Sequence, residues 1–375
     1  MKILYIVPVG GSGGAEKIAY DLALDNVRKG NYVKIIYLKG PLTQIFIDND
    51  KIEKFILNLY SIKDIPKTLV SIYKIMKLFN PDLVHSHIFY SHVVSRLLKP
   101  IFNYKLICSE HGSITPYTKI PKIFFKINNL LKKQSDLNTN VCEEAAQSYI
   151  KYGFYKKNEI VSVYNGIDIH RFINNETKET IPKDIEYYFK SDNRVFLSIG
   201  RLSPEKNFPL LIRAFSKYCT ESNVQDHLLI VGEGKEEEKL KGLVNSLQMS
   251  EQIHFLGRRN DVNLLLKLCD YYCLSSDHEG LPTVLLEAVF SKKPIISTDC
   301  CGAKEILLDN LFISPVGNIE EYTLKLLKAT DFNHSLIIEQ RYQNALIKFT
   351  QQAMLEEWSK IYQVLMNNSK FKVVE

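Results

Sequence analysis

The sequence has few of the features that mark secreted, membrane-spanning or disordered proteins. Its seven cysteines form no CxxC pair, and two of them, Cys300 and Cys301, are adjacent, which argues against both a disulfide framework and a metal site. No apolar run approaches the ~20 residues that a membrane-spanning helix needs. With 45% hydrophobic and 24% charged residues, the composition is that of a folded globular protein. We therefore expect a folded protein with reduced thiols.

Length and charge narrow the class further. At 375 residues the chain exceeds what one hydrophobic core usually serves, so two domains are expected. The net charge of +6 suits an anionic ligand or an anionic membrane surface, and no nucleic-acid-binding motif is present. The apolar run at 3–9 is short and contains Pro8, so a buried first strand explains it better than a signal peptide does. We expect a cytoplasmic protein, at most peripheral on the inner face of the inner membrane, with no nucleic acid as partner.

Short β-branched runs alternate with helical patterns along the whole chain, which is typical of parallel sheets covered by helices. A charged stretch at 171–192 interrupts this order and is interpreted as a linker. The sequence predicts two doubly wound α/β domains, at 1–170 and 193–351, that face each other across a cleft, with a final helix at about 352–375 joined to the first. Expected strands lie at 2–9, 32–38, 82–87, 105–110, 136–141 and 160–164, and then at 194–200, 227–232, 252–257, 270–275 and 293–298.

A glycine-rich segment, GGSGGAE at 10–16, follows the first expected strand and opens a helix. Backbone N–H groups of such a turn approach anions closely, and the helix N-terminus adds a favourable dipole. A dinucleotide site is the alternative, but Glu16 stands where that fingerprint has its third glycine, and the second strand ends without an acidic residue. A purely structural turn stays open.

The second domain opens with GRLSPEKN at 200–207, where a strand gives way to a helix. Arg201 and Lys206 on this loop have the charge to neutralise a diphosphate, the guanidinium by a fork of two hydrogen bonds. The alternative is a solvated loop in which Asn207 caps the helix.

Two glutamates eight residues apart, Glu279 and Glu287, lie in EGLPTVLLE. We expect Glu279 on the loop and Glu287 on a helix that begins near Thr283. Carboxylates suit vicinal hydroxyls of a ribose or hexose, and the N–H groups of Leu281 and Thr283 with the helix dipole suit a phosphate.

With these motifs in order, the sequence resembles the retaining GT-B glycosyltransferases of family 4. GGSGGAE, GRLSPEK, VGEGK (231–235) and EGLPTVLLE match the family's glycine loop, G-R-x4-K, V-G-x-G and E-x7-E segments, and the resemblance covers essentially the whole chain. It implies two Rossmann-like domains and transfer of a hexose or N-acetylhexosamine from a nucleotide-diphosphate sugar, with a UDP-sugar favoured over a GDP-sugar. The implied acceptor is a growing cell-surface polysaccharide, as in capsule or lipopolysaccharide, or a lipid-diphosphate-linked glycan. Neither a metal ion nor another cofactor is expected.

The resemblance also implies roles for single residues. Arg201 and Lys206 would bind the donor diphosphate, Glu287 the ribose, and Arg258 the pocket of the base. His111 and Glu279 would be the catalytic residues, with Glu279 contacting the transferred sugar. The donor-binding set is Gly13, Gly14, Arg201, Lys206, Arg258, Gly280, Leu281, Thr283 and Glu287.

Histidines cluster in HSHIFYSH at 85–92 and SEHGS at 109–113. An HxH pair can chelate a metal ion, but no carboxylate cluster accompanies it. We place His111 at the transferred sugar and His87 second, and a role as core histidines is the alternative. Asp48, Asn49 and Asp50 match a metal-binding DxD only formally and are interpreted as a surface turn.

A basic amphipathic helix is predicted at 119–133. It suits an anionic membrane or a lipid diphosphate, but a helix that packs on the core with its lysines in solvent gives the same pattern. The acceptor and membrane candidates are Glu16, His87, Lys119, Lys122 and Lys126.

Retention at the anomeric carbon without a metal ion is the expected chemistry. The alternatives are another GT-B-type enzyme, such as a UDP-sugar epimerase, or a non-catalytic nucleotide-binding module. Product analysis with and without an acceptor separates these functions.

Overall fold

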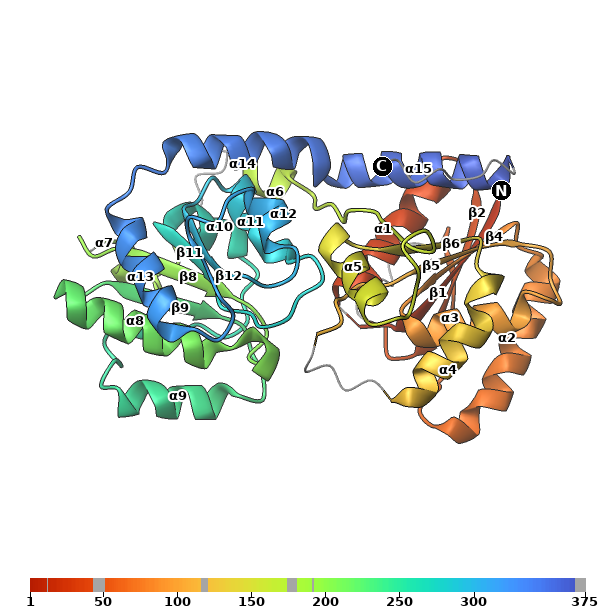
Figure 1. The fold of residues 1–375 in the computed structure, drawn as a ribbon, viewed down its shortest axis with the longest axis horizontal. Helices are drawn as coiled ribbons and strands as arrows, with labels where there is room; N and C mark the ends of the chain where they lie inside the picture. The colour runs from red at the N-terminus through yellow and green to blue at the C-terminus, as the bar shows by residue number, and fades with distance from the viewer. Residues whose placement is uncertain (12, 43–50, 116–120, 174–180, 191, 368–375) are drawn as a thin grey trace. The chain divides into compact units, whose positions relative to one another are not determined.

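A computed structural model describes residues 1–11, 13–42, 51–115, 121–173, 181–190 and 192–367. The chain divides into two compact units (Figure 1): unit 1 comprises Met1–Asn165 with Met354–Glu375, and unit 2 comprises Gly166–Ala353. The stretch 171–192, interpreted above as a linker, includes most of one short helix, α6 (His170–Ile173), and all of another, α7 (Glu186–Lys190).

Unit 1 contains a parallel sheet of seven strands in the order β3-β2-β1-β4-β5-β6-β7. Chain order reverses at β1, which pairs with β2 on one side and β4 on the other. Such a switch point opens a crevice at the carboxyl ends of the strands, where ligands of this fold bind. The strands are β1 (Lys2–Val9), β2 (Tyr32–Lys39), β3 (Glu53–Ile56), β4 (Leu83–His87), β5 (Lys105–Ser109), β6 (Leu137–Asn140) and β7 (Val161–Ser162).

Helices cover both faces of this sheet. One apolar cluster joins β1 and β2 to α1 (Gly14–Arg28) and to the last helix, α15 (Gln351–Met366), through Trp358 and its neighbours. The other joins the opposite face to α2 (Ile65–Phe79) and α3 (Phe89–Leu98). Burial of both faces explains why the central strands β1 and β2 are mostly apolar. The remaining helices are α4 (Lys122–Leu131) and α5 (Glu143–Lys151).

Unit 2 repeats the plan with six strands in the order β10-β9-β8-β11-β12-β13, and chain order reverses at β8. The strands are β8 (Val195–Ile199), β9 (His227–Val231), β10 (Ile253–Phe255), β11 (Tyr271–Leu274), β12 (Ile295–Thr298) and β13 (Ile313–Ser314). Both units are therefore Rossmann-like, as the sequence predicts.

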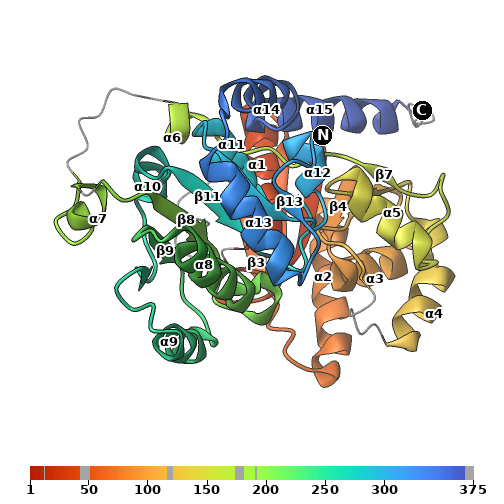
Figure 2. The same cartoon turned by 60° about the vertical axis from the view of Figure 1, so that its left-hand side comes forward.

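The helices of unit 2 surround this sheet. Figure 2 shows α8 and α13 side by side, and they share one core with the sheet. Besides α6 and α7, its helices are α8 (Phe208–Ser222), α9 (Glu237–Ser246), α10 (Val262–Leu268), α11 (Thr283–Phe290), α12 (Ala303–Leu307), α13 (Ile319–Thr330) and α14 (Ser335–Lys348).

Candidate functional site

The switch point of unit 2 brings the predicted donor-binding residue Lys206 into contact with the predicted catalytic residue Glu279. Lys206 follows β8 and Glu279 follows β11, and these strands are neighbours in the sheet. The Lys206 Nζ lies 2.5 Å from Glu279 Oε1, and both side chains are largely buried. Ser276 Oγ donates to the same carboxylate oxygen at 2.7 Å, and Ser275 Oγ donates to the Lys206 carbonyl at 2.8 Å. The loop after β11 thereby fixes the ammonium group at the carboxyl edge of the sheet.

Arg201 has a different environment on the same loop. Its side chain is 75% exposed, and its nearest carboxylate is Glu205 at 3.7 Å. The structure therefore does not bring Arg201 into contact with Glu279. An exposed guanidinium beside a buried, oriented ammonium is one arrangement that can fold onto an incoming diphosphate. Asn207 accepts from the Leu210 N–H at 3.3 Å, so the helix-capping alternative holds for that residue.

Glycines in VGEGK hold the cationic loop in place. Gly232 has a φ of +141°, and a Cβ atom there would lie 1.9 Å from the Gly200 carbonyl oxygen. A Cβ atom at Gly234 would lie 2.1 Å from the Leu202 carbonyl oxygen. The loop after β9 thus approaches the loop after β8 backbone to backbone, and the Leu202 N–H donates to Glu233 O at 2.9 Å.

Gly234→Ala is expected to raise the KM for the donor at least tenfold, because the methyl group displaces the backbone that carries Arg201 and Lys206. Donor kinetics and circular dichroism of the variant measure this. Gly242→Ala is the matched control: Gly242 lies inside α9, where an added Cβ meets nothing within 4 Å. That change should leave the KM unaltered and stabilise the helix by roughly 0.5–1 kcal/mol. Equal KM values for the two variants would contradict the role of the glycine contact.

Glu287 lies on α11, whose N-terminus follows the Glu279 loop. The helix starts at Thr283 after Pro282, with no side chain capping its first N–H groups, so these groups and the helix dipole favour an anion. Glu287 is partly buried, and loss of hydration raises its pKa to about 7, against the opposing charge of Arg171. A carboxyl group in this state can accept or donate a hydrogen bond near neutral pH.

The other predicted donor residues of unit 2 lie around the same edge. Gly280 and Leu281 precede α11, and the backbone of Gly302 comes so near that a Cβ there would lie 3.0 Å from Gly280 O. Arg258 is exposed just after β10 and Gly257. Its neighbour Arg259 is tied to Asp261 at 2.7 Å and Asp184 at 2.6 Å.

In unit 1 the glycine turn follows β1, at the switch point. Gly13 is the N-cap of α1 and offers no side-chain cap, and Gly14 begins the helix. A Cβ atom at Gly13 would lie 2.3 Å from Glu16 Oε2, so the carboxyl group packs directly under the turn. Glu16 is buried there, and burial raises its pKa. The structure therefore gives Glu16 a position beneath the glycine turn, with little exposed surface.

The two predicted histidines meet at the carboxyl ends of β4 and β5. His87 Nδ1 lies 2.8 Å from His111 Nε2. Burial lowers the pKa of His111 to about 4 and that of His87 well below its usual value, so both rings are neutral at physiological pH. Among the residues that the structure describes, His87 Nε2 and His111 Nδ1 contact no hydrogen-bonding partner. Buried polar atoms of this kind usually meet a partner, which a ligand hydroxyl could supply.

A third histidine, which sequence reasoning did not single out, adjoins this pair. His92 Nε2 lies 3.4 Å from Glu110 Oε1 in the core of unit 1. Burial opposes its charge, but Cys108 and Glu110 raise the pKa of His92 to about 9. For Glu110, burial favours the neutral form, but the neighbouring His92 outweighs burial and lowers the pKa of this carboxyl group. The sequence places His92 in the HSHIFYSH cluster and Glu110 directly before His111, but neither position indicates that the two side chains meet. His85 is a core histidine, bonded to Tyr362 of α15 at 2.8 Å and to Ser109 at 2.7 Å.

The basic helix exists as α4, and its exposure is uneven. Of its ten residues only Asn128 is buried, while Phe124 stacks on Phe89 with ring centroids 4.6 Å apart. Leu130 is 78% exposed, and Lys122 and Lys126 also face solvent. Lys119 and the DxD segment at 48–50 lie outside the described residues.

The described residues contain neither a metal-binding cluster nor a membrane-spanning helix. No group of three or more histidine, cysteine or carboxylate side chains there is arranged to hold a metal ion. In the same residues, every helix is too short or too polar to cross a bilayer.

Comparison with known proteins adds to this geometry. A family model described as "Glycosyl transferases group 1" matches residues 181–345, and one described as "Glycosyltransferase Family 4" matches residues 12–171. An uncharacterized glycosyltransferase of Methanocaldococcus jannaschii is 30% identical over 312 residues, covering 77% of this chain and 74% of the relative. The UDP-Gal:α-D-GlcNAc-diphosphoundecaprenol α-1,3-galactosyltransferase of Escherichia coli is 27% identical, covering 82% of each.

Solved structures agree on the fold. A glycosyltransferase from Rickettsia africae superposes with a TM-score of 0.84 at 23% identity, covering 98% of this chain and 99% of its own. Anabaena HepE, solved in complex with UDP, superposes with a TM-score of 0.80 at 20% identity, covering 97% of this chain and 100% of its own.

Proposed function

We propose that this chain, which belongs to the group 1 (family 4) glycosyltransferases, transfers a hexose or N-acetylhexosamine from a UDP-sugar with retention of anomeric configuration. The chain is a glycosyltransferase by its family; the donor, the stereochemistry and the acceptor are the proposal. The contact between Lys206 and Glu279 carries it, because it fixes a cation beside the uncapped start of α11.

The reaction cleaves the bond between the anomeric carbon and the diphosphate oxygen. Negative charge develops on the leaving diphosphate, so stabilisation of that charge is the main catalytic task. Lys206, the exposed guanidinium of Arg201 and the first N–H groups of α11 supply positive charge for this without a metal ion. In the retaining route the acceptor hydroxyl attacks from the face that the diphosphate leaves, and its proton passes to the departing phosphate oxygen.

The carboxylates and histidines orient the sugars in this proposal. Glu279 contacts the transferred hexose, and Glu287 binds the ribose hydroxyls. Neutral His111 donates a hydrogen bond to the sugar, and because the ring is uncharged it does not draw the leaving diphosphate away from Lys206. His87 holds the His111 ring in place by their 2.8 Å contact. Gly13 and Gly14 present backbone N–H groups from unit 1, and Arg258 lies beside the base.

The acceptor in the proposal is a lipid-diphosphate-linked glycan. Relatives act on such substrates by name, including the galactosyltransferase of Escherichia coli and an N-acetylgalactosaminyltransferase of Campylobacter jejuni that is 26% identical and covers 98% of this chain. The chemistry of unit 1 supports this choice, since lysines and exposed apolar side chains share α4.

A screen of UDP- and GDP-sugars with lipid-diphosphate acceptors tests the function. Transfer from a UDP-sugar in the presence of EDTA, giving an α-linked product from an α-linked donor by NMR, is the expected result. An inverted product would reject the retaining mechanism. Sugar conversion without an acceptor would indicate an epimerase instead.

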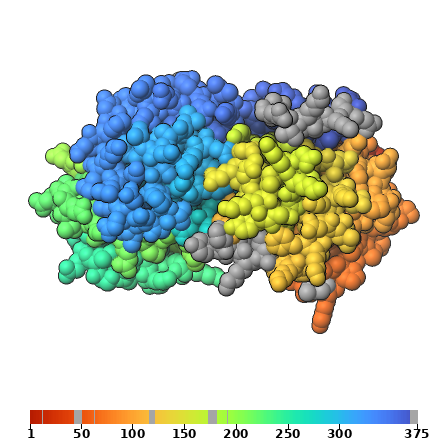
Figure 3. Space-filling model, in the orientation of Figure 1, coloured from red at the N-terminus to blue at the C-terminus, as the bar shows by residue number. Residues whose placement is uncertain are grey.

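The exposed side of α4 is also proposed to contact an anionic membrane surface. Ile123 and Leu130 are exposed apolar residues of this helix, which also contains Lys122 and Lys126 and lies at the front of unit 1 in the view of Figure 3. Ile123→Asp with Leu130→Asp should reduce flotation with vesicles of anionic lipid severalfold and leave donor hydrolysis unchanged. The matched change Leu324→Asp, at an exposed leucine of α13 in unit 2, should have no effect. Equal flotation of the wild type, the double variant and Leu324→Asp would refute the membrane contact.

A further inference from the structure

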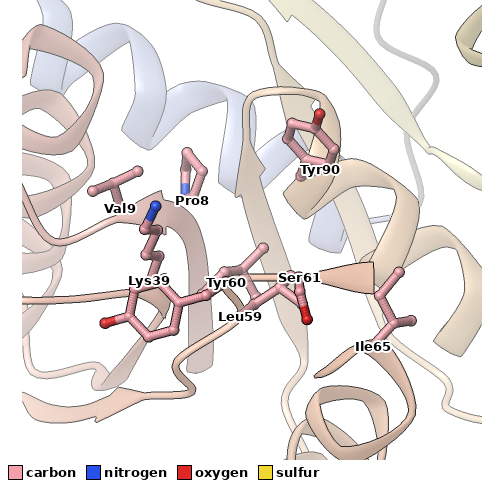
Figure 4. Close-up of a pocket in the computed structure, with 9 residues that line it drawn as sticks. Pro8, Val9, Lys39, Leu59, Tyr60, Ser61, Ile65 and Tyr90 are labelled. Carbon is pink, nitrogen blue, oxygen red and sulfur yellow. The ribbon is translucent and has the colours of Figure 1, made fainter. Parts of the chain in front are cut away.

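Unit 1 contains a cavity of about 420 Å³ on the side of the sheet that carries β2 and β3. The ends of β1 and β2, the segment after β3 and the first turns of α2 and α3 form its walls, as the labelled side chains in Figure 4 show. The residues that line it include Pro8, Leu38, Lys39, Leu59, Tyr60 and Tyr90. None of the roles assigned above uses these residues.

The chemistry of the walls favours an amphiphilic anion. Among the described residues that line the cavity, only Lys39 carries a charge. Its Nζ lies 5.1 Å from the centre of the Tyr60 ring. Two of the lining hydroxyls already donate hydrogen bonds, Tyr60 to Asn58 and Ser61 to Asp64. An ammonium group within apolar and aromatic walls suits a phosphate with a hydrocarbon attached.

The cavity also connects with a surface suited to lipid. Ile65 lines the cavity and begins α2, whose sequence IPKTLVSIYKIMKLF contains no carboxylate. Further along α2, Val70 and Leu78 are exposed apolar residues, and lysines lie between them. A helix with this pattern fits the surface of an anionic membrane, from which a lipid chain could enter.

The position of the cavity fits an acceptor that must reach the histidines. Lys39 ends β2 and His87 ends β4, with β1 between them. At ~4.8 Å per strand, the two strand ends lie roughly 10 Å apart along the carboxyl edge. A phosphate at Lys39 would therefore leave space for a short glycan between the lipid and His87.

We infer that this cavity binds the diphosphate and the first hydrocarbon units of the lipid carrier on which the acceptor glycan is built, with Lys39 pairing to the phosphate. The inference deepens the proposed function and rests on it for the identity of the acceptor. It assigns recognition of the carrier to unit 1 residues that are separate from the donor residues of unit 2.

Direct binding tests the cavity without any need for turnover. Calorimetry of the full chain with geranyl diphosphate should show binding at least tenfold tighter than with either inorganic diphosphate or geraniol. Lys39→Met should weaken geranyl diphosphate at least tenfold, and so should Ile65→Asp, a change that the start of a helix tolerates well. Lys151→Met, at an exposed lysine of α5, should leave the affinity unchanged. UDP should not compete.

The contrary outcomes are equally specific. Unchanged affinity in Lys39→Met and Ile65→Asp, or displacement of geranyl diphosphate by UDP, would overturn the inference. Kinetics separate it from the proposed function: Lys39→Met should raise the KM of a lipid-diphosphate acceptor tenfold and leave the KM of the donor unaltered. Transfer with unchanged acceptor KM would refute the cavity alone. Failure of the wild type to transfer any sugar, with geranyl diphosphate still bound through Lys39, would refute the function alone.

Discussion

Lys206→Ala is expected to lower kcat/KM for sugar transfer on the order of 100- to 1,000-fold, the usual cost of losing one preorganised group that stabilises a developing anion. The loss has two parts. The ammonium no longer meets the diphosphate, and Glu279, at 2.5 Å from Lys206 in the wild type, is left as an unneutralised carboxylate near that anion. Initial rates at several donor concentrations measure the effect.

A double variant separates these two parts. Lys206→Ala with Glu279→Gln removes the residual carboxylate charge, so donor affinity should recover partly while kcat stays low. Lys217→Ala is the matched control, because Lys217 forms its ion pair with Glu320 on the surface of α8 and α13. Wild-type rates in Lys206→Ala, or an equal loss in Lys217→Ala, would refute the assignment.

Glu287→Gln is expected to change activity and stability in opposite directions. Burial raises the pKa of Glu287 to about 7, above the ~4.3 of an unfolded glutamate. Between these values the folded state holds a proton that the unfolded state has released, so this group lowers stability as pH rises from about 4 to 7. Glutamine keeps the shape and removes the charge, so the free energy of unfolding at pH 8 should rise by about 1–3 kcal/mol.

The same change should lower kcat/KM at least a hundredfold, since an amide cannot accept from two ribose hydroxyls as a carboxylate does. Urea denaturation at pH 8 and pH 5, with rates at pH 8, checks both effects, and the stability difference should shrink at pH 5. Glu238→Gln, at an exposed glutamate of α9, is the control and should change neither the free energy of unfolding nor kcat/KM. A Glu287→Gln protein that is active, or no more stable at pH 8, would contradict the account.

Much of the fold follows from the sequence because buried parallel strands form continuous apolar runs. The run at 2–9 corresponds to β1 (Lys2–Val9), and all eleven expected strands appear as strands of the two sheets. The sequence did not predict β3 (Glu53–Ile56) or β13 (Ile313–Ser314), which lie outside the central strands. In β3 the sequence EKFI is half-polar, and β13 has only two residues, which Pro315 follows directly, so neither segment forms a run of apolar residues.

Less of the candidate site than of the fold could be predicted from the sequence, because the contacts between its residues depend on the order of the strands in each sheet. Lys206 and Glu279 are 73 residues apart and meet only because β8 and β11 are neighbours. The buried pair of His92 and Glu110 depends in the same way on β5 and on α3, which follows β4. For α4 the sequence did not decide between packing on the core and contact with a membrane. The structure shows why, because Phe124 packs on Phe89 while Leu130 faces solvent.

A crystal structure with bound UDP tests the central claim most directly, that cations and helix-start amides of unit 2 hold the donor diphosphate. The account predicts phosphate oxygens within hydrogen-bonding distance of Lys206 Nζ, the Arg201 guanidinium and the first N–H groups of α11, with the ribose at Glu287. Electron density for UDP elsewhere, with Arg201 and Lys206 in contact only with solvent and their own carboxylates, would contradict it.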